Sequence, residues 1–217
     1  MRIEEISIDS KKYPQKLRNI YDPPKKLYVL GNKELLNKFG IAIVGSRQAT
    51  QYGKMNSYNV AKELSKNGVV IISGLAVGID SYSHWGAIKA FDMNWNSAGT
   101  VAVLGSGIDN IYPKENIELA NEIIRNGGAI ISEYPCGTKP DKMNFPARNR
   151  IISGLSKGII VIEAKEKSGT LITVDFALEQ GRDVFVVPGN INSINSVGTN
   201  DLIKQGAKMV TSYEDIK

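Results

Sequence analysis

The segment KMNFPARNR combines basic, polar and aromatic side chains directly before an apolar run. Its candidate residues are Lys142, Asn144, Phe145, Arg148 and Arg150. Single-stranded nucleic acids bind to surfaces of this composition, because cations neutralise the phosphates and an aromatic ring stacks on a base. The segment therefore indicates a surface that binds both phosphates and bases.

The same side chains could instead serve the fold. Phe145 could seat the loop in the core, while Arg148 and Arg150 could pair with Glu133 or Glu163. We expect a helix to begin near Arg148, and cations in a first turn are unfavourable for the helix dipole unless an anion offsets the cost. We therefore expect the two arginines to be divided between nucleic acid and internal carboxylates.

Two further loops carry residues that favour anions. In VGSRQAT, Gly45 allows a tight turn after an apolar run, and Ser46 and Arg47 can bind a phosphate. In KEKSGT, Lys165 and Ser168 lie at the expected start of a helix, which is a second position that favours an anion. Either loop taken alone could be an ordinary turn or helix cap, but several such loops in one sheet indicate anion binding.

Known nucleotide-binding fingerprints are absent from the sequence. The GSGIDN segment has Asn110 where a dinucleotide fingerprint needs its third glycine, and there is no G-x-x-x-x-G-K-[ST] loop. The carboxylates Asp80, Glu133, Glu163 and Glu179 have no partner at a diagnostic catalytic spacing. We therefore expect a binding protein without a cofactor rather than an enzyme.

The chain has one cysteine, Cys136, and one histidine, His84, which excludes a Cys/His zinc site. We expect His84 to orient a helix by hydrogen bonding, and Trp85 and Trp95 to pack rather than to stack on a ligand. A lone cysteine suits a reducing compartment, and the sequence has no signal peptide and no membrane-spanning run. We expect a cytoplasmic protein. The formal net charge of +5 is compatible with a polyanionic partner.

The elements that must position these residues alternate regularly along the 217 residues. Continuous apolar runs, as expected for strands buried on both faces, occupy residues 41–45, 69–74, 100–105, 129–132, 159–164, 183–187 and 207–210. Helical patterns occupy residues 53–67, 79–90, 114–126, 148–157, 170–181 and 198–205. This alternation predicts an α/β fold with a doubly wound, mainly parallel sheet of the extended Rossmann type.

We expect residues 1–40, with a short strand at 26–30, to be an N-terminal extension packed on a domain of residues 41–217. In a doubly wound sheet, ligands bind at the carboxyl ends of the strands. The GSR, KMNFPARNR and KEKSGT loops all lie where such ends are expected. The fold and the candidate residues therefore agree.

The sequence resembles the DNA-processing protein A (DprA, or Smf) family. The segments that carry this resemblance are, in order, YPQKLRNIYDPPKKLYVLGN, IAIVGSR, SGLAVGID, LGSGIDNIYPKEN, the block ISEYPCGTKPDKMNFPARNRIISGLSKGIIVIEAKEKSGTLIT, ALEQGRDVFVVPG and GTNDLIKQGA. This resemblance implies a cytoplasmic homodimer that binds single-stranded DNA during natural transformation and recombination, protects incoming strands and loads RecA onto them.

The motif match carries the family's phosphate pocket over to Arg47, Lys142 and Phe145. It extends more loosely to Ser46, Asn144, Arg148 and Arg150, and least firmly to Lys165 and Ser168. Many members have a further C-terminal winged-helix-like domain, and some have an N-terminal helical domain. This sequence covers the family's core, either as a short member or as a trimmed piece, so the functions of those domains stay open. Two alternatives are a phosphoribohydrolase-like enzyme, since SGTLITVDFALEQG places Glu179 in a faintly similar layout, and a sensor of a small nucleotide.

Overall fold

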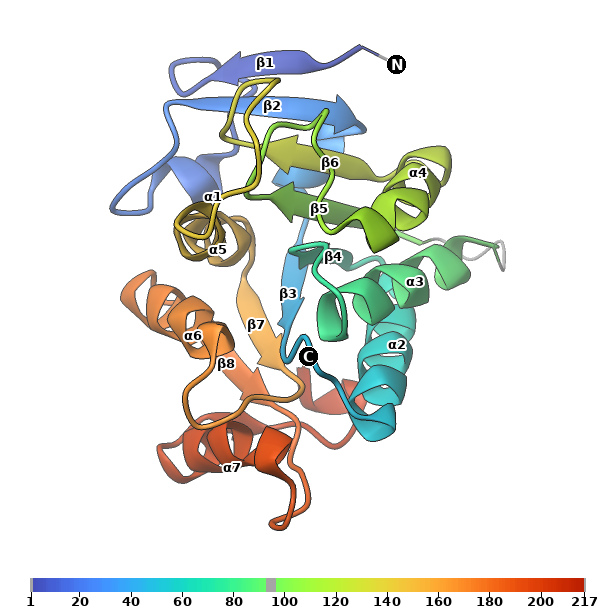
Figure 1. Cartoon of the computed structure of the whole chain (residues 1–217), viewed down its shortest axis with the longest axis vertical. Helices are drawn as coiled ribbons and strands as arrows, with labels where there is room; N and C mark the ends of the chain where they lie inside the picture. Colours follow the sequence, from blue (N-terminus) through green and yellow to red (C-terminus); the bar gives the residue numbers. More distant parts are fainter. Residues whose placement is uncertain (1, 93–96, 217) are drawn as a thin grey trace.

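A nine-stranded sheet runs through the described part of the chain, which comprises residues 2–92 and 97–216 of a computed structural model (Figure 1). The strands are β1 (Glu4–Ser7), β2 (Lys26–Gly31), β3 (Gly40–Val44), β4 (Val70–Ser73), β5 (Thr100–Leu104), β6 (Ala129–Ser132), β7 (Gly158–Val161), β8 (Asp183–Val186) and β9 (Lys208–Met209). They lie in the order β1-β2-β6-β5-β4-β3-β7-β8-β9. Strands β3 to β9 are parallel, which confirms the doubly wound, mainly parallel α/β fold.

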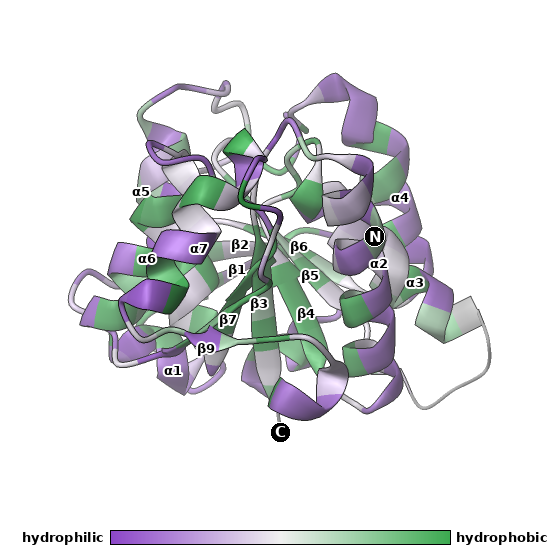
Figure 2. Cartoon of the chain, turned by 90° about the horizontal axis from the view of Figure 1, so that it is seen from below, coloured by the Kyte–Doolittle hydropathy of each residue, from purple (hydrophilic) through white to green (hydrophobic). Residues whose placement is uncertain are grey.

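Helices cover both faces of this sheet (Figure 2). The α-helices are α1 (Gln15–Arg18), α2 (Gln51–Lys66), α3 (Ile79–Asp92), α4 (Ile117–Arg125), α5 (Asn144–Leu155), α6 (Gly169–Glu179) and α7 (Val197–Lys204). Short 3-10 helices occupy Lys33–Asn37, Lys114–Asn116, Ile194–Ser196 and Tyr213–Ile216. Helices α2, α3 and α4 pack on one face, and α1, α5, α6 and α7 on the other.

The central strand explains why its sequence is apolar without alternation. Ile41 and Ile43 of β3 face the core beneath α2 and α3, whereas Ala42 and Val44 face the core beneath α5 and α6. Ile41 is paired with Ile71 of β4 on one side, and β7 lies on the other. Both faces of the strand are therefore buried, as is usual for parallel sheets.

Helix α5 begins at Asn144, so the prediction that a helix starts near Arg148 was wrong. Pro146 lies in its first turn, where a missing N–H costs nothing because those N–H groups have no partner within the helix. Arg148 and Arg150 consequently lie in the second turn. The argument from the helix dipole no longer applies to them.

The N-terminal segment continues the sheet. Strand β2 pairs antiparallel with β6, and β1 pairs antiparallel with β2 at the edge. Leu17 and Leu27 of this segment are fully buried in the same core as α5 and α6. The short strand at 26–30 is confirmed, β1 was not predicted, and the domain boundary at residue 40 stays a prediction.

The two tryptophans were expected to pack. Trp85 is 37% exposed, so it packs only in part, and Trp95 lies outside the described residues. Gly68 follows α2 with a φ of 81°, a backbone conformation that favours glycine after a helix end. None of the described helices combines the length and apolar character that crossing a bilayer requires.

Candidate nucleic-acid interface

A groove of about 640 Å³ opens at the carboxyl ends of the central strands. The chain leaves β3 towards β4 on one side, and β7 lies on the other, which makes this the switch point of the sheet. Seven of the nine predicted site residues line the groove, namely Ser46, Arg47, Lys142, Phe145, Arg148, Lys165 and Ser168. Asn144 and Arg150 do not line it. Whether any of these residues binds DNA stays a prediction.

An aromatic and cationic platform forms one part of the groove. The guanidinium carbon of Arg47 lies 5.4 Å from the centre of the Phe145 ring. The ring of Tyr112 lies 5.6 Å from Phe145 at an interplanar angle of 32°. A Cβ atom at Gly105 would lie 2.9 Å from Cδ1 of Phe145, so a glycine at the end of β5 lets the ring approach the sheet. Aromatic rings and a guanidinium plane are groups on which a nucleic-acid base can stack.

Tyr112 was missed by the sequence reading. Its side chain is 46% exposed and lines the groove beside Phe145. The available signal was its position in GSGIDNIYP, a glycine loop after an apolar run. A smaller cavity of about 70 Å³ adjoins the platform, lined by Arg47, Gly74, Ala76, Val77, Gly105, Tyr112, Pro113, Phe145 and Arg148.

Arg148 lies at the floor of the groove and is 4% exposed. Its guanidinium donates to the carbonyl oxygens of Gly74, at 2.6 Å, and of Val103. Asp80 is also buried nearby and accepts from the N–H groups of Gly74 and Ala76. Burial lowers the pKa of Arg148 to about 10, and the charge of Asp80 opposes that shift. Arg148 is therefore a buried cation at neutral pH.

Burial likewise raises the pKa of Asp80, while the positive charge of Arg148 acts in the opposite direction. The two groups thus offset part of each other's desolvation cost. Because Asp80 partly balances the charge of Arg148, the groove floor does not present an isolated charge in the core.

Glu163 fixes the loop that carries Ser46 and Arg47. The N–H of Thr50 donates to Oε2 of Glu163 at 2.9 Å, and the Thr50 hydroxyl donates to Oε1. The N–H of Ser46 donates to the Glu163 carbonyl oxygen at 2.9 Å. Glu163 therefore binds Thr50, the N-cap residue of α2, rather than pairing with an arginine, so that part of the alternative interpretation was wrong.

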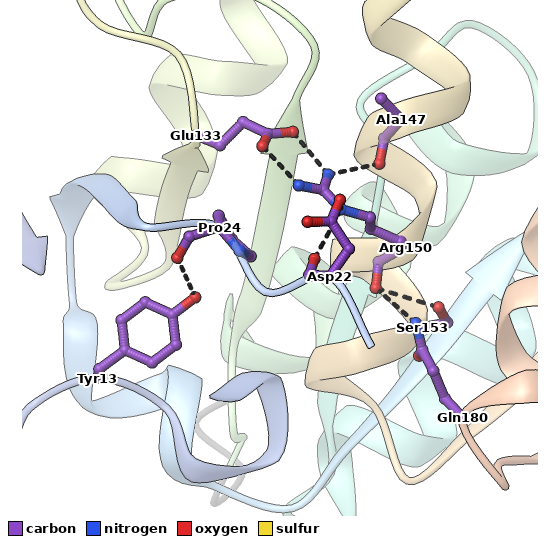
Figure 3. A network of polar contacts seen from close by, with 8 residues as sticks. All are labelled: Tyr13, Asp22, Pro24, Glu133, Ala147, Arg150, Ser153 and Gln180. Carbon is purple, nitrogen blue, oxygen red and sulfur yellow. Dashed lines mark hydrogen bonds and ion pairs between the residues drawn. The ribbon is translucent and has the colours of Figure 1, made fainter. Parts of the chain in front are cut away.

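Arg150 points away from the groove into an internal network (Figure 3). Its Nη1 and Nη2 donate to the two carboxylate oxygens of Glu133 at 2.8 and 2.7 Å. Its Nε donates to the Asp22 carbonyl oxygen at 2.9 Å, and Gln180, the C-cap residue of α6, donates to the Arg150 carbonyl oxygen. Pairing of Arg150 with Glu133 is confirmed. This residue joins α5 to β6, α6 and the N-terminal segment.

Lysines and a helix cap form another part of the groove. Lys165 donates to Oε1 of Gln48 at 2.7 Å, which links the loop after β7 to the loop after β3. Ser168 caps α6 and accepts from the N–H of Thr170 at 3.2 Å. Lys142 is exposed at the groove. These contacts hold cationic and donor groups together in the groove.

His84 lies outside the groove, in the core. Its Nδ1 is 2.7 Å from the Thr100 hydroxyl, and that hydroxyl donates to the Ile71 carbonyl oxygen. Since the hydroxyl proton is already used, His84 must donate from Nδ1. Burial lowers the pKa of His84 to about 3, so the ring is neutral. The hydrogen-bonding role is confirmed.

Within residues 2–92 and 97–216, no group of three or more histidine, cysteine, aspartate or glutamate side chains is arranged to hold a metal ion.

Comparison with known proteins decides the family. A family model described as "DNA recombination-mediator protein A" matches residues 4–217. The chain belongs to this family. It is 49% identical over 215 residues to the DNA processing protein DprA of Bacillus subtilis, covering 99% of this chain and 70% of that protein.

Two solved structures of the DprA family resemble the chain closely. The structure of DprA from Streptococcus pneumoniae superposes with a TM-score of 0.91 at 44% identity, covering 100% of this chain and 74% of that one. DprA from Helicobacter pylori, whose structure is described as revealing a single-stranded DNA binding mode, gives 0.85 at 32% identity, covering 99% and 94%. The chain spans between 52% and 70% of the four curated relatives that are at least 42% identical to it.

Proposed function

We propose that this protein binds single-stranded DNA in the groove at the switch point, without hydrolysing it. The observation that carries the proposal is the platform of Arg47, Phe145 and Tyr112 beside the buried cation Arg148. Cations next to stacked rings bind a flexible strand at its phosphates and its bases together, with little dependence on sequence. The single-stranded DNA binding mode described for the H. pylori relative supports the same assignment.

The finer parts of the proposal follow from membership of the family. We propose that the protein acts in the cytoplasm as a homodimer, protects strands that enter during natural transformation, and loads RecA onto them. The proposed DNA contacts are the seven predicted residues that line the groove, namely Ser46, Arg47, Lys142, Phe145, Arg148, Lys165 and Ser168. Asn144 and Arg150 are proposed to support that surface from outside the groove.

The enzyme alternative finds no support in the position of Glu179. That residue lies exposed at the last turn of α6, whereas Ser168, at the first turn, lines the groove. The eleven residues of α6 separate the two ends by about 15 Å. Glu179 therefore does not reach a ligand in the groove.

Binding to oligonucleotides at several salt concentrations tests the proposal. We expect the protein to bind poly-dT more tightly than a duplex of equal length. If three phosphates are neutralised, log affinity should fall against log salt with a slope of about −2. Arg47→Ala and Lys142→Ala should each weaken binding on every sequence and reduce the slope by about 0.7. The matched control is Lys157→Ala, an exposed lysine at the opposite, amino end of β7.

The outcomes separate the parts of the proposal. Failure to bind single strands at low salt would contradict it altogether, and release of a free base from a nucleoside monophosphate would favour the enzyme. If strands bind but RecA assembles no faster on DNA coated with single-strand-binding protein, then the RecA part is wrong and the binding part stands. The mass in solution, with and without oligonucleotide, tests the dimer.

A further inference from the structure

Helix α3 exposes an unusual stripe to solvent. Its described side chains, Ile79 to Phe91, are buried except for Tyr82, Trp85, Lys89 and Phe91. The first three recur at i, i+3 and i+7 and therefore share one side of the helix. Tyr82 is 36% exposed and Trp85 is 37% exposed. A water-facing helix stripe is normally polar, so two aromatic rings beside a lysine need an explanation.

Helix α2 packs beside α3 (Figure 1) and adds cations to the stripe. Nζ of Lys54 lies 5.6 Å from the centre of the Tyr82 ring. One turn further, a Cβ atom at Gly86 would lie 2.2 Å from the Tyr58 carbonyl oxygen, so the helices touch there. Lys62 follows Tyr58 by four residues on the same side of α2. The two helices thus run in the same direction and form one continuous surface.

We define the α2/α3 ridge by its residues Lys54, Tyr58, Lys62, Tyr82, Trp85 and Lys89. The acidic residues of the two helices are Glu63, in the last turn of α2, and Asp80 and Asp92, in the first and last turns of α3, of which Asp80 is buried. Lys54 and Lys62 therefore stand beside Tyr58, Tyr82 and Trp85, and the first three turns of α2 contain no carboxylate. This composition matches a polyanion that carries flat bases, and it does not match an acidic protein surface, which would leave the rings without a role.

The ridge is continuous with the groove. The loop before α3 contributes Ala76 and Val77 to the small cavity that Arg47 also lines. A Cβ atom at Gly78 would lie 2.4 Å from the Ser46 carbonyl oxygen, and the N–H of Ile79 donates to that oxygen at 3.2 Å. The Arg47 loop and the start of α3 are therefore in direct contact, and Tyr82 lies one turn beyond that contact.

We propose that the α2/α3 ridge is a second segment of the strand's path. The inference rests on the proposed binding of single-stranded DNA in the groove. A strand that leaves the groove past Arg47 continues over the ridge, where Tyr82 and Trp85 stack on bases and the lysines neutralise phosphates. From Tyr82 to Lys89 the helix rises about 10 Å, which is roughly the length of three stacked nucleotides.

Oligonucleotides of two lengths test this inference separately from the groove. An oligo-dT of about 6 nucleotides should occupy the groove alone, and one of about 20 should also reach the ridge. Tyr82→Ala and Trp85→Ala should each weaken binding of the long oligonucleotide by about five-fold or more and leave the short one unchanged. Lys142→Ala should weaken both. The matched control is Phe39→Ala, which removes a ring that is 54% exposed at the amino end of β3.

Tryptophan fluorescence gives an independent readout that needs no change on the ridge. The chain has two tryptophans, so Trp95→Phe leaves Trp85 as the sole reporter. The long oligonucleotide should quench its emission, and the short one should not. The inference is overturned if long and short oligonucleotides respond alike to Tyr82→Ala and Trp85→Ala. It is also overturned if Trp85→Ala dissociates a dimer without changing affinity for the long oligonucleotide. Loss of binding for both lengths in the unmodified protein would instead contradict the groove itself.

Discussion

Arg148 and Arg150 are two residues apart on α5, which turns their side chains about 200° from one another around the helix axis. Arg148 consequently points to the ends of β4 and β5, where it donates to carbonyl oxygens at the groove floor. Arg150 points to β6 and the N-terminal segment, where Glu133 and Asp22 bind it. Identical charges thus serve a proposed ligand site in one case and the fold in the other.

At the scale of single residues, Phe145→Ala should weaken binding of single-stranded DNA by about 1–3 kcal/mol, because it removes the centre of the aromatic platform. Phe145→Tyr should retain most of the affinity, since a ring remains. Fluorescence anisotropy with a labelled poly-dT measures both variants. The side chain is only partly buried, so we expect Phe145→Ala to stay folded. If this variant unfolds instead, then Phe145 belongs to the core.

His84 should make the protein sensitive to acid. Its pKa is about 3 in the folded state, because of burial first and the charge of Arg148 second, and about 6.5 in the unfolded chain. Between these values only the unfolded chain binds the proton, so stability falls as the pH drops from 6.5 towards 3, by up to about 1.4 kcal/mol per pH unit.

Urea unfolding at pH 7, 5 and 4 measures the effect of His84. The variant His84→Gln keeps an N–H donor for Thr100 but cannot be protonated, so its stability should depend less on pH over this range. Burial raises the pKa of Asp80 above its ordinary value of 3.8, so Asp80 stabilises the folded state as the pH falls towards that value. This effect opposes that of His84 and is the same in both proteins. An unchanged pH dependence in His84→Gln would show that another group dominates.

At the scale of elements, the groove depends on where α5 lies. The Arg150 network fastens that helix to the end of β6, to α6 through Gln180, and to the N-terminal segment through Asp22. Phe145 and Arg148 are on the same helix. A displacement of α5 would therefore move the platform and the groove floor together, although no residue of the network lines the groove.

Breaking the Arg150–Glu133 pair should destabilise the fold strongly. The two side chains are 11% and 15% exposed, so removing one partner leaves a largely buried charge, at a cost of about 3–5 kcal/mol. Arg150→Met and Glu133→Gln, each alone and then together, form a double-mutant cycle measured by urea unfolding. We expect the double variant to be less destabilised than the sum of the two single ones. Additive effects would mean that the ion pair itself contributes little.

All six helices and seven strands that the alternating pattern predicted are present. The strands could be predicted because a strand that is buried on both faces of the sheet leaves a continuous apolar run in the sequence. The sequence also grouped Arg47, Lys142 and Phe145 correctly in one groove. It named Glu133 as a possible partner of Arg150 but left open whether Arg150 contacts nucleic acid or a carboxylate, because Glu133 and Asp22 are 17 and 128 residues away in the chain. Tyr112 was missed for the same reason, since only the fold brings it against Phe145.

At the scale of the whole molecule, the N-terminal segment is part of the main sheet and core. A chain beginning at residue 41 should therefore be poorly folded, because it loses the buried Leu17, Leu27 and Val29 and leaves β6 as an open edge. Removing residues 1–8, which takes away only the edge strand β1, should cost much less. Hydrogen exchange and solubility measure both. Cooperative unfolding of the chain 41–217 would instead support an independent domain with its boundary at residue 40.

The pairing of β2 with β6 also governs how the protein can fold while it is being made. About 100 residues separate Gly31 from Ala129, and at 5–20 residues per second the ribosome needs roughly 5–20 s to produce them. During that interval β2 is already synthesised but its partner does not yet exist, so its backbone groups and apolar side chains are open to other chains. A nascent chain of this topology can therefore associate with other chains through β2 until β6 has been synthesised. A chaperone that binds the first 31 residues would protect the chain during this interval.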